Sequence, residues 1–235
     1  MTREEFILEL QKININLTEE QLDKLDKFYQ LLINWNEKIN LTTITKEDDV
    51  YLKHFYDSLT LIKVIDLREN LKILDVGSGA GFPGIVLKIV FPNLKITLLD
   101  SLNKRINYLN EIIKELELKD IETVGARCEE YTKIHHEEYD LIVSRAVAHL
   151  KILLEITFQS IKVKGFLIAM KSNAFDEIKE SEDIINKLNG KIIQVEEFNL
   201  PKEDSLRTLI KIEKLGTTNN KYPRKYSEIK KSLKK

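Results

Sequence analysis

The spacing of apolar residues divides the chain into a helical first part and a second part in which strands alternate with helices. Within residues 1–66, apolar residues recur at three- and four-residue steps, which is typical of one buried helix face. This stripe contains Leu22, Leu25, Phe28, Leu32, Trp35 and Ile39. Thr18 and Gln21 form a capping-box pattern before it, and Asn40 can end the helix. A second helical pattern covers about residues 47–65, so we predict a helical extension that packs on the rest.

From residue 71 onward, short apolar runs of strand type alternate with helical patterns. The runs lie at residues 72–76, 95–100, 121–125, 139–143, 165–171, 191–198 and 206–213. Such alternation predicts parallel strands with helices on both faces of a sheet. Only seven residues separate the last two runs, too few for a crossover helix, so this pair should be antiparallel. We predict an α/β fold with a mostly parallel seven-stranded sheet and an antiparallel last strand.

The charge is distributed unevenly along the chain. The 235 residues carry a net charge of −1, so the whole molecule has no strong field that would attract a polyanion. Residues 221–235, however, contain seven Lys or Arg residues and one acid, Glu228. Such a tail is typical of an arm that contacts phosphates, and a solvated, disordered terminus is the alternative. We divide the chain into the extension (1–66), the core domain (67–215) and the basic tail (216–235).

Cysteine content and hydropathy limit the location and the kinds of site. Cys128 is the only cysteine, which excludes an intrachain disulfide and a cysteine-based zinc site, and we expect no metal. The N-terminal residues lack the pattern of a signal peptide, and no uncharged apolar stretch approaches the roughly 20 residues that cross a bilayer. We therefore expect a cytoplasmic protein without membrane contact. The sequence carries no signal for the oligomeric state, and a monomer is the expectation.

A glycine-rich segment, Asp75-Val-Gly-Ser-Gly-Ala-Gly81, follows the first predicted strand. Alternate glycines leave a loop without side-chain bulk, so a ligand can approach its backbone and the free N–H groups of the next helix. Asp100 ends the second predicted strand, 19 residues after Gly81. Its carboxylate can accept hydrogen bonds from both ribose hydroxyls of a nucleoside. Together the loop and the acid indicate a cofactor that contains adenosine.

Two cofactors of that kind compete, NAD and S-adenosylmethionine (SAM). Gly79-x-Gly81-x-x-Gly84 matches the dinucleotide pattern as a string, but that pattern should begin directly after the strand, where Gly77 stands. Asp75 favours SAM, because an acid at the strand end can face the cationic amino-acid part of that cofactor. We predict a Rossmann-like, SAM-dependent methyltransferase fold, and a glycine turn without a ligand is the alternative.

Several segments, in order along the chain, carry a resemblance to one family. They are the glycine loop with its continuation Phe82-Pro-Gly-Ile85, Trp35-Asn-Glu-Lys-Ile-Asn-Leu-Thr42, His54-Phe-Tyr-Asp-Ser58, Asp100-Ser-Leu-Asn-Lys-Arg105, Ser144-Arg-Ala146 and Tyr222-Pro-Arg224. Over about residues 28–226 the chain resembles the RsmG (GidB) methyltransferases. It departs from the pattern after Arg224, where the family leads us to expect a Gly and a Pro. The resemblance implies methyl transfer from SAM to N7 of a guanine in bacterial 16S ribosomal RNA, with that RNA or the assembling small subunit as partner.

The resemblance also implies a set of cofactor contacts. They are Gly77, Phe82, Asp100, Cys128, Glu129 and Arg145. Glu129 could accept a hydrogen bond from the adenine amino group, while Cys128 would pack on the ring as a small apolar residue and not act as a nucleophile. Arg145 stands at the carboxyl end of the fourth predicted strand, where open α/β sheets bind ligands.

The implied reaction needs no general base, because guanine N7 carries a lone pair and no proton. We therefore name no catalytic residue. His54 and Asp57 are three residues apart on one helical face, where they could pair with each other and contact RNA, or simply pack the helix. Lys171 and Arg224 are further candidate contacts to the substrate. Two alternatives remain: a methyltransferase for a small molecule, and a protein that binds SAM or NAD without turnover.

Overall fold

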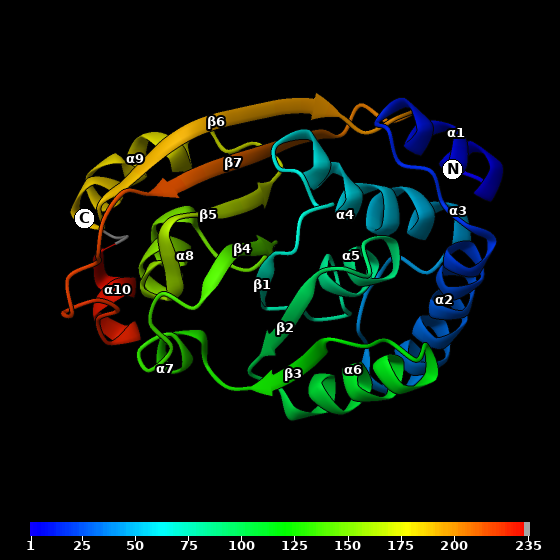
Figure 1. Cartoon of the computed structure of the whole chain (residues 1–235), viewed down its shortest axis with the longest axis horizontal. Coiled ribbons are helices and arrows are strands. Elements are labelled where there is room, and N and C mark those ends of the chain that lie inside the picture. The colour runs from blue at the N-terminus through cyan, green and yellow to red at the C-terminus, as the bar shows by residue number, and fades with distance from the viewer. Residues whose placement is uncertain (233–235) are drawn as a thin grey trace.

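The computed structural model describes residues 1–232 and contains one seven-stranded sheet in the order β3-β2-β1-β4-β5-β7-β6 (Figure 1). The strands are β1 (Lys72–Val76), β2 (Lys95–Asp100), β3 (Ile121–Gly125), β4 (Tyr139–Arg145), β5 (Ile161–Lys171), β6 (Gly190–Asn199) and β7 (Leu206–Lys214). β1 to β5 pair in parallel, and β7 runs antiparallel to both β5 and β6. The predicted Rossmann-like topology and its antiparallel last strand are confirmed.

Helices cover both faces of this sheet, as Figure 1 shows. One face carries α1 (Arg3–Lys12), α2 (Glu19–Ile39), α5 (Gly84–Val90) and α6 (Asn103–Glu115); the other carries α7 (Cys128–Tyr131), α8 (Leu150–Thr157), the 3₁₀ turn η3 (Phe158–Ser160), α9 (Phe175–Lys187) and α10 (Tyr226–Ser232). Successive strand residues point to opposite faces. In β1, Ile73 belongs to the first apolar cluster and Leu74 to the second. This alternation determines which side chains of β1 can reach a ligand.

The N-terminal helices share the core of the first face. The predicted capping box forms at α2, where Thr18 Oγ1 accepts the N–H of Gln21, and Asn40 ends the helix in the left-handed conformation (φ 47°). Gln21 also donates its side-chain amide to the carbonyls of Ile89 and Val90, which end α5. These contacts join the extension to the sheet, and the division of the chain into three parts stays a prediction.

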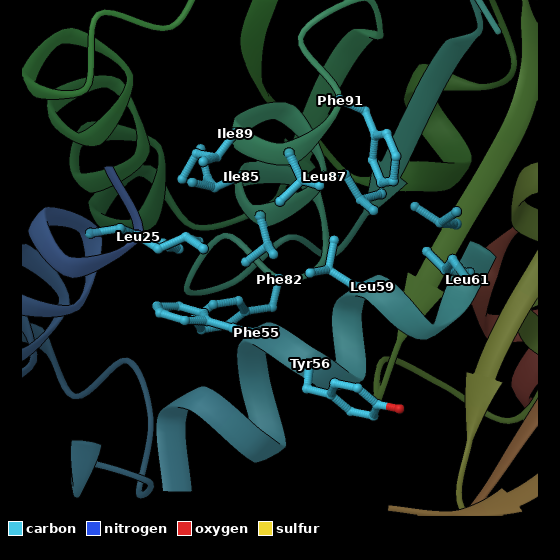
Figure 2. Packing of buried hydrophobic residues seen from close by; sticks show 14 of the residues in the cluster. Leu25, Phe55, Tyr56, Leu59, Leu61, Phe82, Ile85, Leu87, Ile89 and Phe91 are labelled. Atoms are coloured by element: carbon cyan, nitrogen blue, oxygen red, sulfur yellow. The ribbon is translucent and has the colours of Figure 1, made fainter. Parts of the chain in front are cut away.

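The predicted helix over residues 47–65 is wound irregularly. It consists of α3 (Glu47–Val50), the π-helix η1 (Tyr51–Tyr56), α4 (Asp57–Leu59) and the 3₁₀ turn η2 (Thr60–Lys63). Ser58 and Thr60 donate side-chain hydroxyls to the backbone carbonyls of His54 and Asp57, at 2.6 Å each. Figure 2 shows Phe55 of this segment lying directly beneath Phe82 and α5. The apolar side thus anchors the segment, and the polar side reaches the carboxyl end of β4.

Two strands are longer than the sequence pattern indicates. β4 continues to Arg145, and β5 begins at Ile161, with a register shift between Tyr139 and Leu141. Lys164, in the added part of β5, has a positive φ of 68°, so this end of the strand is irregular and its residues break the alternating pattern.

Candidate functional site

A first cavity of about 430 Å³ lies at the carboxyl ends of β1 to β4. Its lining includes all six residues that the sequence analysis associates with a cofactor, namely Gly77, Phe82, Asp100, Cys128, Glu129 and Arg145. The structure therefore brings together residues that are up to 68 positions apart in sequence. Their contacts with a bound cofactor stay predictions.

The glycine loop holds its shape through its backbone. Gly77, Gly79 and Gly81 have φ values of 71°, 58° and 93°, a region that residues with a Cβ atom rarely adopt. Gly77 and Ser78 donate their N–H groups to the carbonyl of Leu99 at 2.8 and 3.2 Å, which ties the loop to the end of β2. A Cβ atom at Gly77 would lie 2.5 Å from Cγ2 of Val147. The loop after β4 therefore closes on the glycine loop, and only glycine fits between them.

Asp75 does not face the first cavity, so that part of the sequence interpretation was wrong. Alternation along β1 turns its side chain toward α5, where Oδ2 accepts the N–H of Gly84 at 3.0 Å. The carboxyl group is fully buried, Oδ1 has no hydrogen-bond partner among residues 1–232, and burial raises the pKa to about 7. The side chain occupies the N-terminus of α5, the place where a dinucleotide fold holds its pyrophosphate. This position is an argument against NAD that the sequence did not supply.

Asp100 is buried at the end of β2 and already holds the surrounding loops. Its Oδ2 accepts hydrogen bonds from Gly79 N at 3.0 Å and from Arg105 Nη1 at 3.2 Å, and its Oδ1 accepts one from Leu102 N at 2.9 Å. A carboxylate can accept about four hydrogen bonds, so room for one more remains on Oδ1. Asp100 can thus accept a hydrogen bond from one ribose hydroxyl in the present arrangement. It can accept from a second hydroxyl if the hydrogen bond from Arg105 is broken.

The end of the first cavity beyond Asp100 is lined by Ala126, Arg127, Cys128, Glu129, Ile156 and Tyr226. Cys128 Sγ donates to the carbonyl of Ile156 at 3.2 Å, and burial raises the pKa of the thiol. A protonated, hydrogen-bonded thiol fits the predicted packing role and not that of a nucleophile. Glu129 follows on the same helix with no hydrogen bond or ion pair to another residue of the described chain, so its carboxylate can accept from a ligand. Ile156 and Tyr226 complete this end.

A stack of three side chains forms the opposite wall. The His54 ring lies on the Phe82 ring with centroids 4.3 Å apart, and the Arg145 guanidinium lies 5.1 Å from the centroid of the same ring. Arg145 Nη2 lies 3.2 Å from His54 Nδ1, while His54 Nε2 lies 3.0 Å from Thr42 Oγ1. Burial, reinforced by the Arg145 charge, lowers the pKa of His54 to about 3. His54 is therefore neutral. Its Nδ1 also lies 3.1 Å from the carbonyl of Lys53, so the tautomer sets whether this nitrogen accepts from the guanidinium or donates to that carbonyl.

His54 and Asp57 do not pair with each other, contrary to the sequence interpretation. The wider π-helical turn changes their relative positions, and Arg145 lies between them. The Asp57 carboxylate accepts from Arg145 Nη1 at 3.2 Å through Oδ2 and from Arg207 Nε at 3.0 Å through Oδ1. Because only 5% of the Asp57 side chain is exposed, this is a largely buried bridge between two cations.

A second cavity of about 370 Å³ adjoins the first at His54, Arg145 and Ala146. Charged side chains dominate the rest of its lining, which adds Lys53, Asp57, Lys171 and Arg207. Lys171, another predicted substrate contact, is held by Glu177 at 2.7 Å and by the carbonyl of Ala148. Three of the four predicted substrate residues, namely His54, Asp57 and Lys171, therefore line this cavity.

The fourth predicted substrate residue, Arg224, lines neither cavity. Its guanidinium forms two hydrogen bonds of 2.6 Å with the carboxylate of Glu155, and its backbone N–H donates to the same group. With these donors engaged by a buried acid, Arg224 has a docking role that its basic surroundings in the sequence did not indicate.

Lys53, Arg207 and Tyr226 also line the two cavities, and none of them was predicted from the sequence. Arg207 is the second residue of β7, and the N-terminus of an antiparallel strand lies at the same edge as the carboxyl ends of its parallel neighbours. The predicted antiparallel direction of this strand would therefore have been enough to place Arg207 at the edge of the sheet that binds ligands. Nothing in the sequence pattern places Tyr226 beside Cys128.

Known proteins resemble this chain in both sequence and fold. A profile of the family described as rRNA small subunit methyltransferase G (GidB) matches residues 21–206. A protein named "Ribosomal RNA small subunit methyltransferase G" from Acetivibrio thermocellus is 49% identical over 90% of this chain and 88% of its own length. One of the same name from Staphylococcus carnosus is 45% identical over 95% of both chains. The chain belongs to the GidB family.

Solved structures agree with the fold of a GidB protein. A SAM-dependent methyltransferase from Aquifex aeolicus matches with a TM-score of 0.54 and 21% identity, over 72% of this chain and 94% of that one. A ribosomal protein L11 methylase from Lactobacillus delbrueckii subsp. bulgaricus matches with a TM-score of 0.52 and 15% identity, over 74% and 81%. This GidB protein is a SAM-dependent methyltransferase with a Rossmann-like fold, and a small-molecule acceptor is not favoured.

Two features are absent from residues 1–232, a membrane-spanning helix and a cluster of metal-binding side chains. No helix there has the length and apolar character needed to cross a membrane. No group of three or more His, Cys, Asp or Glu side chains there is arranged to hold a metal ion.

Proposed function

We propose that this protein transfers a methyl group from SAM to N7 of a guanine in the 16S RNA of the small ribosomal subunit. The observation that carries the proposal is the meeting of two cavities at His54, Arg145 and Ala146. One cavity has the glycine loop and acid of a nucleoside cofactor site, and the other has cationic side chains suited to a nucleotide. A cofactor in the first and a base in the second would approach each other across this shared wall.

The residues of the first cavity fit SAM in their chemistry. The glycine backbone can receive the amino-acid part, Asp100 a ribose hydroxyl, and Cys128 with Glu129 the adenine ring and its amino group. Bound SAM supplies an electrophilic methyl group on a sulfonium centre. The N-terminus of α5 is already occupied by Asp75, so the first cavity offers no helix end for a pyrophosphate.

Positioning is the task left to the wall residues, because N7 attacks with its own lone pair. Both ring nitrogens of neutral His54 have partners within the protein, Nδ1 at Arg145 and the Lys53 carbonyl and Nε2 at Thr42, so His54 is not placed to remove a proton, and none needs removal. Holding two reactants at near-attack distance can lower the barrier by roughly 7–11 kcal/mol. The Phe82 stack and the Asp57 bridge fix the side chains that would set this distance.

The second cavity suits a single extruded nucleotide. N7 lies on the major-groove edge of guanine, which is poorly reached in an A-form helix, so the base must come from an open loop or be flipped out. Lys53, Lys171 and Arg207 would contact its phosphate or base edge with donors that their ion pairs leave unused. Those ion pairs join Lys53 to Asp49 and Glu203, Lys171 to Glu177, and Arg207 to Asp57. Exposed Lys221 and Lys230 of the tail can add phosphate contacts, while Lys234 and Lys235 lie outside the described residues.

The place of action and the assembly state follow as further proposals. We infer that the protein works in the cytoplasm, where its proposed substrate is made, and that it acts as a monomer.

The test is methyl transfer from labelled SAM to small-subunit RNA, both naked and assembled with proteins, followed by mapping of 7-methylguanosine. We expect label at N7 of one guanine in at least one of the two substrates. Absence of label from both would contradict the proposal. Lys171→Gln is a useful variant, because it should weaken RNA binding and reduce the slope of affinity against salt by about one while SAM affinity stays unchanged.

A further inference from the structure

The C-terminal segment folds back on the domain through an ion pair. Glu155 of α8 is 1% exposed, and both of its carboxylate oxygens accept hydrogen bonds from the Arg224 guanidinium. Hydrogen bonding to Glu155 raises the pKa of Arg224. A bidentate pair of this kind fixes orientation as well as distance. The segment after residue 221 is therefore attached at a defined point, in contrast to the flexible arm that its charge pattern alone would indicate.

Beyond that pair, α10 lies along α8, as Figure 1 shows at the C-terminal side of the molecule. Ile229 is 1% exposed and packs with Ile152 and Ile156 of α8. One turn earlier, Tyr226 contacts the same apolar cluster together with Cys128, and it lines the first cavity. The chain terminus thus contributes an aromatic side chain to a cavity whose other residues come from the sheet domain and the N-terminal extension.

We propose that Tyr226 is a cofactor-binding residue that covers the adenine ring of SAM, and that the Arg224–Glu155 pair positions it there. Asp100, at the end of β2, is the ribose partner, so the adenine must extend from it toward β3 and α7 or toward β1. The β1 side is taken by the glycine loop, whereas the α7 side holds Cys128, Ile156 and Tyr226. An aromatic ring there can stack on the flat, apolar face of a purine.

Calorimetric binding of SAM, S-adenosylhomocysteine and adenosine to the full chain tests the proposal, with no RNA present. Tyr226→Ala should weaken all three ligands by roughly five- to tenfold, because all three share the adenine. Tyr226→Phe keeps the ring and should bind within about twofold of the natural protein. Full affinity in Tyr226→Ala would overturn the proposal, as would equal losses in the Ala and Phe variants, since stacking needs the ring and not the hydroxyl.

Two lysines on the same segment provide matched controls. Lys225 and Lys231 are exposed and line neither cavity, so Lys225→Gln and Lys231→Gln should leave the affinity for all three ligands unchanged. A loss in these variants equal to that in Tyr226→Ala would mean that the charge of the segment, and not the ring, acts on the cofactor. Because Tyr226 is only half-buried, the melting temperature without ligand should change little in any of these variants.

The positioning role of Arg224 has its own test. Arg224→Lys keeps the charge but cannot form the two parallel hydrogen bonds, so it leaves Glu155 paired while loosening the segment. Its adenosine affinity should fall, and in the double variant with Tyr226→Ala the two losses should not add, because both act through one ring. Additive losses would overturn the positioning role. These readouts use the cofactor alone, so their failure would be distinguishable from failure of the proposed RNA acceptor.

Discussion

The two cavities share one edge of the sheet and one wall, yet they are built in different ways. The first is centred on backbone: the glycine loop, which is tied to β2, and the turn after β3. The second is shaped by charged side chains from η1, β4, β5 and β7, with Asp57 bridging Arg145 and Arg207. A backbone-built site depends on local conformation, whereas a charge-built site depends on ion pairs between distant segments. The two should therefore respond differently to substitution.

The largest expected effect is on the second cavity. Asp57→Ala should lower the free energy of unfolding by roughly 3–5 kcal/mol, because it leaves two largely buried guanidinium groups without their shared partner. Urea unfolding at neutral pH measures the loss. Asp57→Asn keeps the shape and removes only the charge, so it should fall between Asp57→Ala and the natural protein. A loss below about 1 kcal/mol in Asp57→Ala would show that the bridge is no more than a surface pair.

The same contrast explains what the sequence could predict. The fold and the antiparallel pair follow from runs of contiguous residues, since periodicity reports local conformation. The glycine spacing and Asp100 indicated a nucleoside site for the same reason, whereas the full set of six residues in the first cavity came from the family resemblance. The bridge at Asp57 could not be predicted, because it depends on a π-helical turn and on where β7 inserts between β5 and β6. Asp75 was misplaced for a related reason: the motif gives its position in the chain, but the strand alternation decides the face.

The second largest effect is on how the free energy of unfolding depends on pH. Two buried groups, His54 in the shared wall and Asp75 directly before the glycine loop, change this free energy in opposite directions as the pH rises. His54 has a pKa of about 3 when folded against 6.5 as a model value, so stability is lost as pH falls below about 6.5. Asp75 has a pKa of about 7 against 3.8, so stability is lost as pH rises from about 3.8 toward 7. Each group changes the free energy of unfolding by at most about 1.4 kcal/mol per pH unit. The two changes have opposite signs between about pH 3.8 and 6.5, where both groups titrate.

Variants should separate the two slopes. Asp75→Asn removes one titration, so the free energy of unfolding should rise with pH between 4 and 6.5 more steeply than in the natural protein, by up to about 1.4 kcal/mol per unit. His54→Gln should give the opposite change. Denaturant unfolding at pH 4.5, 5.5 and 6.5 provides the measurement. Parallel curves for all three proteins would mean that neither group keeps its unusual protonation state in the fold.

A third prediction tests the backbone-built cavity with two neighbouring glycines. Gly77→Ala and Gly79→Ala both place a Cβ in the left-handed region, at a cost of about 1–2 kcal/mol each. Only Gly77→Ala also meets Val147, at 2.5 Å, whereas the nearest atom at Gly79 is 3.7 Å away. SAM affinity should therefore be about tenfold weaker in Gly77→Ala than in Gly79→Ala, because Val147 must move within the cavity lining. Equal affinities in calorimetry would show that this close approach does not shape the site.

The smallest expected effect is the sharpest test of the separation between the cavities. Arg207→Lys keeps a positive charge in the second cavity but loses the planar donor that faces Asp57, and Arg145 still pairs that carboxylate. The affinity for SAM should stay within about twofold, and kcat/KM for the RNA should fall by roughly fivefold, about 1 kcal/mol of transition-state binding. Steady-state kinetics with calorimetry of the same protein gives both values. If SAM affinity falls as far as kcat/KM, the two cavities act as one site and the shared wall at His54 and Arg145 transmits the change. If only kcat/KM falls, the cavity assembled from distant ion pairs serves the acceptor, and the one built on the glycine loop serves the cofactor.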